Sequence, residues 1–204
     1  MAGAFIVFEG GDGVGKSTQA ALLADWLRAQ GREVLLTFEP GATPLGAAIR
    51  SILLGNQTGD ISPRSEALLY AADKASHIAD AVRPALERGA VVVCDRYVDS
   101  MLAYQGAGRV LDLAEVEAIA NWATGALAPE LTVLLDLDPE AAMAGIPDKD
   151  RLEAAGADFH LRVRRHFLAL AARDPKRYLV LPARQPVAEL AAAIQQRVSA
   201  LLAG

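Results

Sequence analysis

The stretch "FIVFEGGDGVGKSTQAALLADWL" (residues 5–27) determines the fold class of this chain. It begins as an apolar, strand-like run, contains four glycines within six residues and continues as a helix-like segment. The spacing Gly10-x4-Gly15-Lys16-Ser17 matches a phosphate-binding loop, in the strand-to-helix context that such a loop requires. The alternative is a glycine-rich turn that binds nothing, but the order of strand, loop, Lys-Ser pair and helix favours the phosphate loop.

The chemistry of the loop follows from its backbone. Glycines allow successive N–H groups to point into one concavity that holds phosphate oxygens, and the following helix N-terminus adds unpaired donors and partial positive charge. We expect Lys16 to reach the outer phosphates and the Ser17 hydroxyl to ligate Mg²⁺. The predicted ATP site comprises Gly10, Gly11, Asp12, Gly13, Val14, Gly15, Lys16, Ser17 and Thr18.

Length and composition indicate one folded domain over residues 1–204. The chain is 52% hydrophobic and 22% charged, as in a globular protein with a substantial core. Its longest apolar runs have the length of strands, and the first of them starts at about residue 4, so we expect neither a membrane span nor an N-terminal signal. The net charge of −5 disfavours general binding to nucleic acid.

The single cysteine, Cys94, cannot form an internal disulfide, which fits a reducing cytoplasm. It lies in an apolar, strand-like run. We therefore expect a buried, inert thiol, the alternative being a nucleophile.

Short apolar segments alternate with helix-like segments along the whole chain. Expected helices run over residues 18–30, 62–79 and 186–202, with caps at Ser62 and Asp112. Pro84 is expected to kink or restart a helix. Such alternation predicts an α/β fold with a parallel five-stranded sheet and helices on both faces. The expected strands are Ala4–Glu9, Glu33–Phe38, Ala90–Asp95, Leu131–Leu137 and Tyr178–Leu181.

Charged residues follow two of these strands, at the sheet edge where ligands collect in open α/β folds. Asp95 ends the third strand and is expected to hold Mg²⁺ directly or through water, while Arg96 is expected to bind a phosphate. Arg96 is alternatively only a salt-bridge partner of Asp95. Glu39 ends the second strand, and Arg50 lies on a short helix after it.

Six segments resemble bacterial thymidylate kinases, which are phosphate-loop nucleoside monophosphate kinases, in content and order. They are "EGGDGVGKSTQ", "EPGATPLGAAIRSILL", "EALLYAADKASHI", "DRYVDSMLAYQGAGR", "PELTVLLDLDPE" and "DRLE". The resemblance covers residues 5–183. It implies transfer of a phosphoryl group from ATP to dTMP, giving dTDP, with Mg²⁺, in a cytoplasmic homodimer whose interface includes residues 68–82.

The resemblance also assigns roles to single residues. Asp12 is expected at the 3′-hydroxyl of the acceptor sugar, Tyr70 stacked on thymine, and Tyr104 against the 2′ side of the sugar. Arg96 acts on the acceptor phosphate together with Arg50. The implied acceptor site comprises Asp12, Glu39, Arg50, Tyr70, Lys74, Arg96, Met101, Tyr104 and Gln105, the metal ligands are Ser17 and Asp95, and the catalytic residues are Lys16, Arg96 and Arg151.

The lid, expected over residues 145–157, is short and contains two basic residues, Lys149 and Arg151. The segment by itself fits a mobile flap or an ordinary loop. Because the phosphate loop lacks a basic residue before Lys16, Arg151 is the expected donor-side charge and Lys149 the fallback.

The chain departs from its relatives near the acceptor. Phe38 and Lys74 each replace an arginine, Ala42 replaces a glycine, and Met101 replaces a small polar residue. These changes represent either drift within a working thymidylate kinase or an altered acceptor preference, including a kinase for other deoxynucleoside monophosphates. A nucleotide-binding switch without transfer is a third hypothesis, but the chain lacks the guanine-reading Asn-Lys-x-Asp segment.

Overall fold

The computed structural model describes residues 3–55, 59–143 and 155–203. In this part of the chain, parallel strands form one sheet in the order β2-β3-β1-β4-β5. The strands are β1 (Ala4–Glu9), β2 (Val34–Phe38), β3 (Val91–Asp95), β4 (Leu131–Asp136) and β5 (Tyr178–Pro182). The predicted parallel five-stranded sheet is thus confirmed, and each strand lies within one residue of its expected limits.

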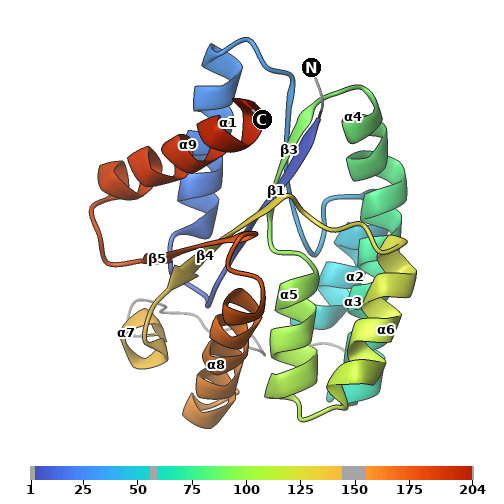
Figure 1. The fold of residues 1–204 in the computed structure, drawn as a ribbon. Helices are drawn as coiled ribbons and strands as arrows, with labels where there is room; N and C mark the ends of the chain where they lie inside the picture. Colours follow the sequence, from blue (N-terminus) through green and yellow to red (C-terminus); the bar gives the residue numbers. More distant parts are fainter. Residues whose placement is uncertain (1–2, 56–58, 144–154, 204) are drawn as a thin grey trace.

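Helices cover both faces of the sheet, as predicted. Figure 1 shows α1 and α9 on one side and α2 to α6 on the other. The helices are α1 (Lys16–Ala29), α2 (Pro44–Leu54), α3 (Pro63–His77), α4 (Arg83–Glu87), α5 (Val98–Met101), α6 (Leu113–Thr124), α7 (Pro139–Met143), α8 (Ala157–Arg173) and α9 (Val187–Ala203), with π-helical turns η2 (Ile78–Val82) and η3 (Leu102–Gly108).

The alternation of side chains along β1 explains the two layers. Ile6 and Phe8 pack against α1 and α9, whereas Phe5 and Val7 pack against η2 and α4 on the opposite face. Every residue of β1 is buried, which is why its sequence is a nearly continuous apolar run. Only Glu9, at its carboxyl end, is ionisable.

Local signals begin the helices where the sequence predicts. The Ser62 hydroxyl accepts a hydrogen bond from the backbone N–H of Ser65, and the Asp112 carboxylate accepts from two N–H groups of α6. The chain stays helical from α3 through the π-helical turn η2 into α4, with right-handed helical dihedrals at Val82 and Arg83, and Pro84 lies in the first turn of α4. The expected restart at Pro84 is therefore not seen, because the helical dihedrals continue from η2 into α4.

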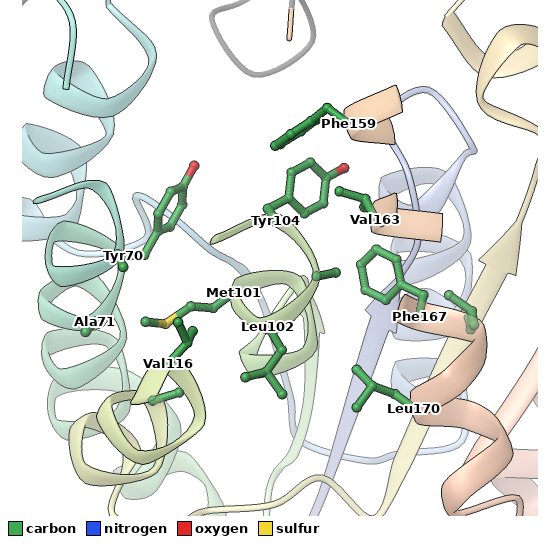
Figure 2. Packing of buried hydrophobic residues seen from close by; sticks show 14 of the residues in the cluster. Tyr70, Ala71, Met101, Leu102, Tyr104, Val116, Phe159, Val163, Phe167 and Leu170 are labelled. Carbon is green, nitrogen blue, oxygen red and sulfur yellow. The ribbon is translucent and has the colours of Figure 1, made fainter. Parts of the chain in front are cut away.

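A second apolar core lies among the helices that surround the carboxyl edge of the sheet. Figure 2 shows Tyr104 between Tyr70 on one side and Phe159 and Phe167 on the other. The ring of Tyr104 makes edge contacts with Phe159 and Phe167, at centroid distances of 6.0 and 6.3 Å. This packing fixes the wall of the pocket described next.

Candidate active site

The phosphate loop leaves β1 and enters α1 through glycines in conformations that side chains avoid. Gly10 has φ 134° and Gly15 has φ 92°, and a Cβ on Gly10 would lie 2.4 Å from the carbonyl oxygen of Leu135. The Lys16 ammonium folds back and donates to the carbonyl oxygen of Gly11 at 2.6 Å. Burial lowers the pKa of Lys16 to about 8, and the nearby charge of Arg96 acts in the same direction. A bound anion would therefore stabilise the charged form of Lys16.

Ser17 and Asp95 meet across the edge of the sheet. The Ser17 hydroxyl donates to Asp95 Oδ2 at 2.5 Å, and both residues line a pocket with Lys16. Among the described residues no three His, Cys, Asp or Glu side chains cluster in a way that could hold a metal ion. Mg²⁺ beside a nucleotide usually takes one or two protein oxygens and completes its shell with phosphates and water, so this pair fits it.

Arg96 pairs with Asp12 in the loop. Its guanidinium forms an ion pair with Asp12 Oδ1, while the Tyr104 hydroxyl donates to Asp12 Oδ2 at 2.8 Å. Burial raises the pKa of the Asp12 carboxyl, but the charges of Arg96 and Lys16 outweigh it and bring the pKa below its ordinary value. Asp12 is therefore an ionised acceptor in the middle of the site.

A buried ionic network lies where β2 ends and α3 packs against it. The Glu39 carboxylate forms an ion pair with Lys74 and lies 2.7 Å from His77 Nδ1, and His77 Nε2 lies 2.7 Å from the Thr37 hydroxyl. Lys74 and Glu39 are 2% and 3% exposed, so water screens this pair little. Burial raises the pKa of Glu39, but Lys74 and His77 bring it below its ordinary value.

Arg50 reaches the pocket over the segment that follows β2. Its Nη1 donates to the carbonyl oxygen of Pro40 at 2.8 Å, and its guanidinium carbon lies 5.9 Å from the centroid of Phe38. Phe38 is 45% exposed, and its ring lies beside the Arg50 guanidinium. Phe38 is the residue that stands where the resemblance implies an arginine.

Gln105 and Met101 are almost completely buried at the bottom of the pocket. Gln105 Nε2 donates to Glu66 at 3.0 Å, and Glu66 also accepts two hydrogen bonds from Arg109 at 3.1 Å. Figure 2 shows the Met101 side chain extending toward α3, near Tyr70. An apolar thioether therefore lies beside the aromatic wall.

The structure brings all nine predicted acceptor-site residues into the lining of one pocket. Sequence reasoning missed Pro40, Leu54 and Ser100, which also line it. Arg96 lies outside α5, with φ 70°, so helical spacing does not connect it to Ser100 and the sequence carried no local signal for this residue. Arg151 and Lys149 lie outside the described residues, as does most of the expected lid, and α8 begins at Ala157.

The two pockets share four residues. Asp12, Glu39, Arg50 and Arg96 line both the acceptor pocket and the pocket that contains Lys16, Ser17 and Asp95. A phosphate loop next to a second, aromatic-walled pocket with shared lining residues is typical of a kinase with the fold of P-loop NTPases.

Comparison with known proteins identifies the family within this class. The family model described as thymidylate kinase matches residues 8–194. The chain is 59% identical over 202 residues to thymidylate kinase of Cutibacterium acnes, with 99% of each chain covered, and 50% identical over 205 residues to that of Bifidobacterium longum (strain DJO10A), with 98% and 100% covered. The crystal structure of thymidylate kinase from Ehrlichia chaffeensis superimposes with a TM-score of 0.82 at 28% identity, covering 97% of this chain and 100% of that one. The chain belongs to the thymidylate kinase family and is an enzyme.

No helix in the described part of the chain is both long enough and apolar enough to cross a bilayer.

Proposed function

We propose that this enzyme transfers the γ-phosphoryl group of ATP to the 5′-phosphate of dTMP, forming ADP and dTDP. The observation that carries the proposal is the shared boundary of the two pockets, which Asp12, Arg50 and Arg96 all line. A donor phosphate on the loop and an acceptor phosphate held by the arginines would face each other there. Direct in-line transfer requires this arrangement.

Charge neutralisation is the main task of the protein in this reaction. Two phosphate groups that approach each other repel, and Lys16, Arg50 and Arg96 offset this repulsion in a partly dry cleft. The Lys16 ammonium exchanges its hydrogen bond with the Gly11 carbonyl oxygen for contacts with the donor phosphates. Burial lowers the pKa of Lys16, and the negative charge of these phosphates raises it again, which keeps the ammonium protonated. The acceptor is already an anion, so the site needs no strong general base.

We propose Ser17 and Asp95 as the protein ligands of Mg²⁺. Their oxygens lie 2.5 Å apart, and both line the pocket of the phosphate loop. When bound, Mg²⁺ neutralises charge on the donor phosphates. The Ser17 oxygen and the Asp95 carboxylate would hold the ion, Asp95 directly or through water.

The sugar of the acceptor is assigned to Asp12 and Tyr104. The ionised Asp12 carboxylate is an acceptor for the 3′-hydroxyl, and Tyr104 is held against it by a hydrogen bond of 2.8 Å. The Tyr104 ring is packed between aromatic neighbours and yields little space for a 2′-hydroxyl. We infer a preference for deoxyribose.

The base is assigned to Tyr70, Lys74 and Met101. Tyr70 stacks on the pyrimidine, and Lys74 donates one hydrogen bond to an exocyclic carbonyl, so thymine and uracil are favoured over cytosine. The Lys74 ammonium already forms an ion pair with Glu39, so its contact with a base competes with that pair. Met101 has no hydroxyl that could form a hydrogen bond with the base. These two observations favour a second candidate function, a kinase that accepts a broader set of deoxynucleoside monophosphates.

On the donor side, we propose that Arg151 of the lid contacts the phosphates of ATP, with Lys149 as the alternative. The support is chemical, because the loop residues ahead of Lys16 carry no other positive charge. Arg151→Ala should then lower kcat more than it weakens dTMP binding, and Lys149→Ala tests the alternative.

We also propose a homodimer formed through α2, α3 and α6. These helices pack together, and they expose Leu45, Leu68 and Trp122 at 56%, 57% and 85%. Exposed large apolar side chains on adjacent helices are typical of an interface. Sedimentation at micromolar concentration should give twice the 21.5 kDa mass of the chain, and Leu68→Glu should give the monomer.

A cytoplasmic location is proposed from the chemistry of Cys94. It is buried as a free thiol, and burial raises its pKa well above the ordinary value, so it is unreactive. Fractionation of the source cells tests the location.

The proposed activity is tested with one coupled assay of ADP release from ATP with dTMP, dUMP, dCMP, dGMP or dAMP as the acceptor. We expect dTMP to give the highest kcat/KM, followed by dUMP. A higher kcat/KM with dCMP or a purine nucleotide would refute the dTMP assignment. ADP release that is independent of every acceptor would refute transfer.

A further inference from the structure

Glu9, the last residue of β1, is fully buried directly ahead of the phosphate loop. Its carboxylate reaches the segment that follows β3. Glu9 Oε1 accepts hydrogen bonds from the backbone N–H groups of Tyr97 and Ser100 at 2.8 and 3.1 Å, and Oε2 accepts from the Ser100 hydroxyl at 2.6 Å. One buried side chain thus joins the ends of two neighbouring strands on which both substrate pockets depend.

The Ser100 hydroxyl connects Glu9 to Arg96. Ser100 Oγ donates to Glu9 Oε2 and lies 3.0 Å from Arg96 Nη1. A guanidinium only donates, so Ser100 accepts from Arg96 and uses its single proton for Glu9. When Glu9 is ionised its oxygens only accept, so the Ser100 proton lies on the Glu9 side while the Ser100 oxygen accepts from Arg96. The orientation of this hydroxyl is therefore set by the Glu9 carboxylate.

Arg96 needs such support because its backbone is unusual. Its φ of 70° lies in the left-handed region, which a residue with a long side chain adopts only when its surroundings enforce it. Its N–H donates to the carbonyl oxygen of Phe8 at 2.9 Å, and Glu9 holds the next N–H, that of Tyr97. Glu9 therefore restrains Arg96 at the backbone and, through Ser100, at the guanidinium.

We propose that Glu9 is a positioning residue for phosphoryl transfer, which holds the Arg96 guanidinium at the boundary of the two pockets through Tyr97 and Ser100. This proposal rests on the proposed role of Arg96 in binding the acceptor phosphate. Arg96 and Ser100 line the acceptor pocket, whereas Glu9 is fully buried and acts through them.

A double-mutant cycle with Glu9→Gln and Ser100→Ala tests the proposal. Each single variant should lower kcat/KM for dTMP about tenfold, the effect of losing one charge-assisted hydrogen bond, while KM for ATP changes less than about twofold. The double variant should resemble the single variants, because all three break the same chain from Glu9 to Arg96. The product of the two effects, about a hundredfold loss, would show independent roles and overturn the proposal. If the single variants impaired the kinetics with ATP as much as those with dTMP, Glu9 would have only a structural role, and this result would also overturn the proposal.

The controls separate this proposal from the function on which it rests. Glu189→Gln makes the same chemical change on the exposed first turn of α9 and should leave both substrates within about twofold. If Glu9→Gln does not fold, Glu9→Asp, which keeps the charge and shortens the reach to Ser100, replaces it in the cycle. Arg96→Lys with unchanged dTMP kinetics would refute the role of Arg96 itself. A loss in Arg96→Lys combined with independent Glu9 and Ser100 effects would refute the positioning role of Glu9 alone.

Discussion

Replacing Lys74 by methionine removes one charge from the buried network under the acceptor pocket. Methionine fills most of the volume of the lysine stem, so packing changes little and the electrostatic effect dominates. The Glu39 carboxylate keeps His77 as a partner but loses the ammonium in a region where both side chains are at most 2% exposed. The variant therefore contains a buried charge that is only partly compensated.

The expected cost follows from this burial. Breaking a buried pair by removing one partner typically costs about 3–5 kcal/mol, and the remaining contact with His77 places the effect near 3 kcal/mol. With a urea m-value of about 2 kcal/mol per M, the unfolding midpoint should fall by roughly 1.5 M. The double variant Lys74→Met, Glu39→Gln should regain about half of this loss, because the unpaired charge is gone.

Urea unfolding followed by circular dichroism measures these shifts. Arg64→Met is the matched control, because its pair with Glu115 is exposed, at 78% and 62%, and should contribute less than about 0.5 kcal/mol. If Lys74→Met lowers the midpoint no more than Arg64→Met, Glu39 does not depend on Lys74. If the double variant is less stable than Lys74→Met, the unpaired carboxylate is not the source of the loss.

Three further predictions concern the loop, the base and pH. Lys16→Ala should fold normally and lose phosphoryl transfer by about two orders of magnitude or more, whereas a folded variant with half the natural kcat would contradict the role of this lysine. Lys74→Arg combined with Met101→Ser should raise the ratio of kcat/KM for dTMP over dCMP, and an unchanged ratio would show that neither side chain contacts the base. Burial, reinforced by the Asp99 carboxyl, raises the pKa of Glu9 from its ordinary 4.5 to about 7. Because the folded state binds this proton more tightly than the unfolded state, protonation of Glu9 stabilises the folded protein. This contribution to the free energy of unfolding is fully present below pH 4.5 and is lost as the pH rises through about 7. Urea unfolding should therefore show a smaller deficit for Glu9→Gln relative to the natural chain near pH 8 than near pH 5, and an equal deficit would contradict the raised pKa.

The three central strands β1, β3 and β4 were predictable because each is a nearly continuous apolar run that is buried on both sides, whereas the outer strands β2 and β5 are partly exposed. The caps at Ser62 and Asp112 were equally local, since a cap and the N–H groups that it satisfies lie within three residues. The π-helical turn η3, which carries Tyr104, had no such signal. Its geometry depends on packing against α8, far away in the chain.

Within the site, the phosphate loop was predictable for the same local reason. Its glycines, Lys16 and Ser17 are contiguous, and the backbone alone brings them together. The acceptor-site residues came from resemblance, and the structure brings them into one pocket without testing their roles.

Only the tertiary structure decided which charges pair. Arg96 could have paired with its neighbour Asp95, but the fold places it on Asp12, 84 positions away, and places Ser100 on Glu9 across 91 positions. The chain contains 25 acidic residues, and no local pattern selects one of them as the partner of a given arginine. The sequence alone thus predicted the phosphate loop, because that loop is built from consecutive residues. The parallel register of β1 and β3 determined how Arg96 is held, because only that register brings the two strand ends together.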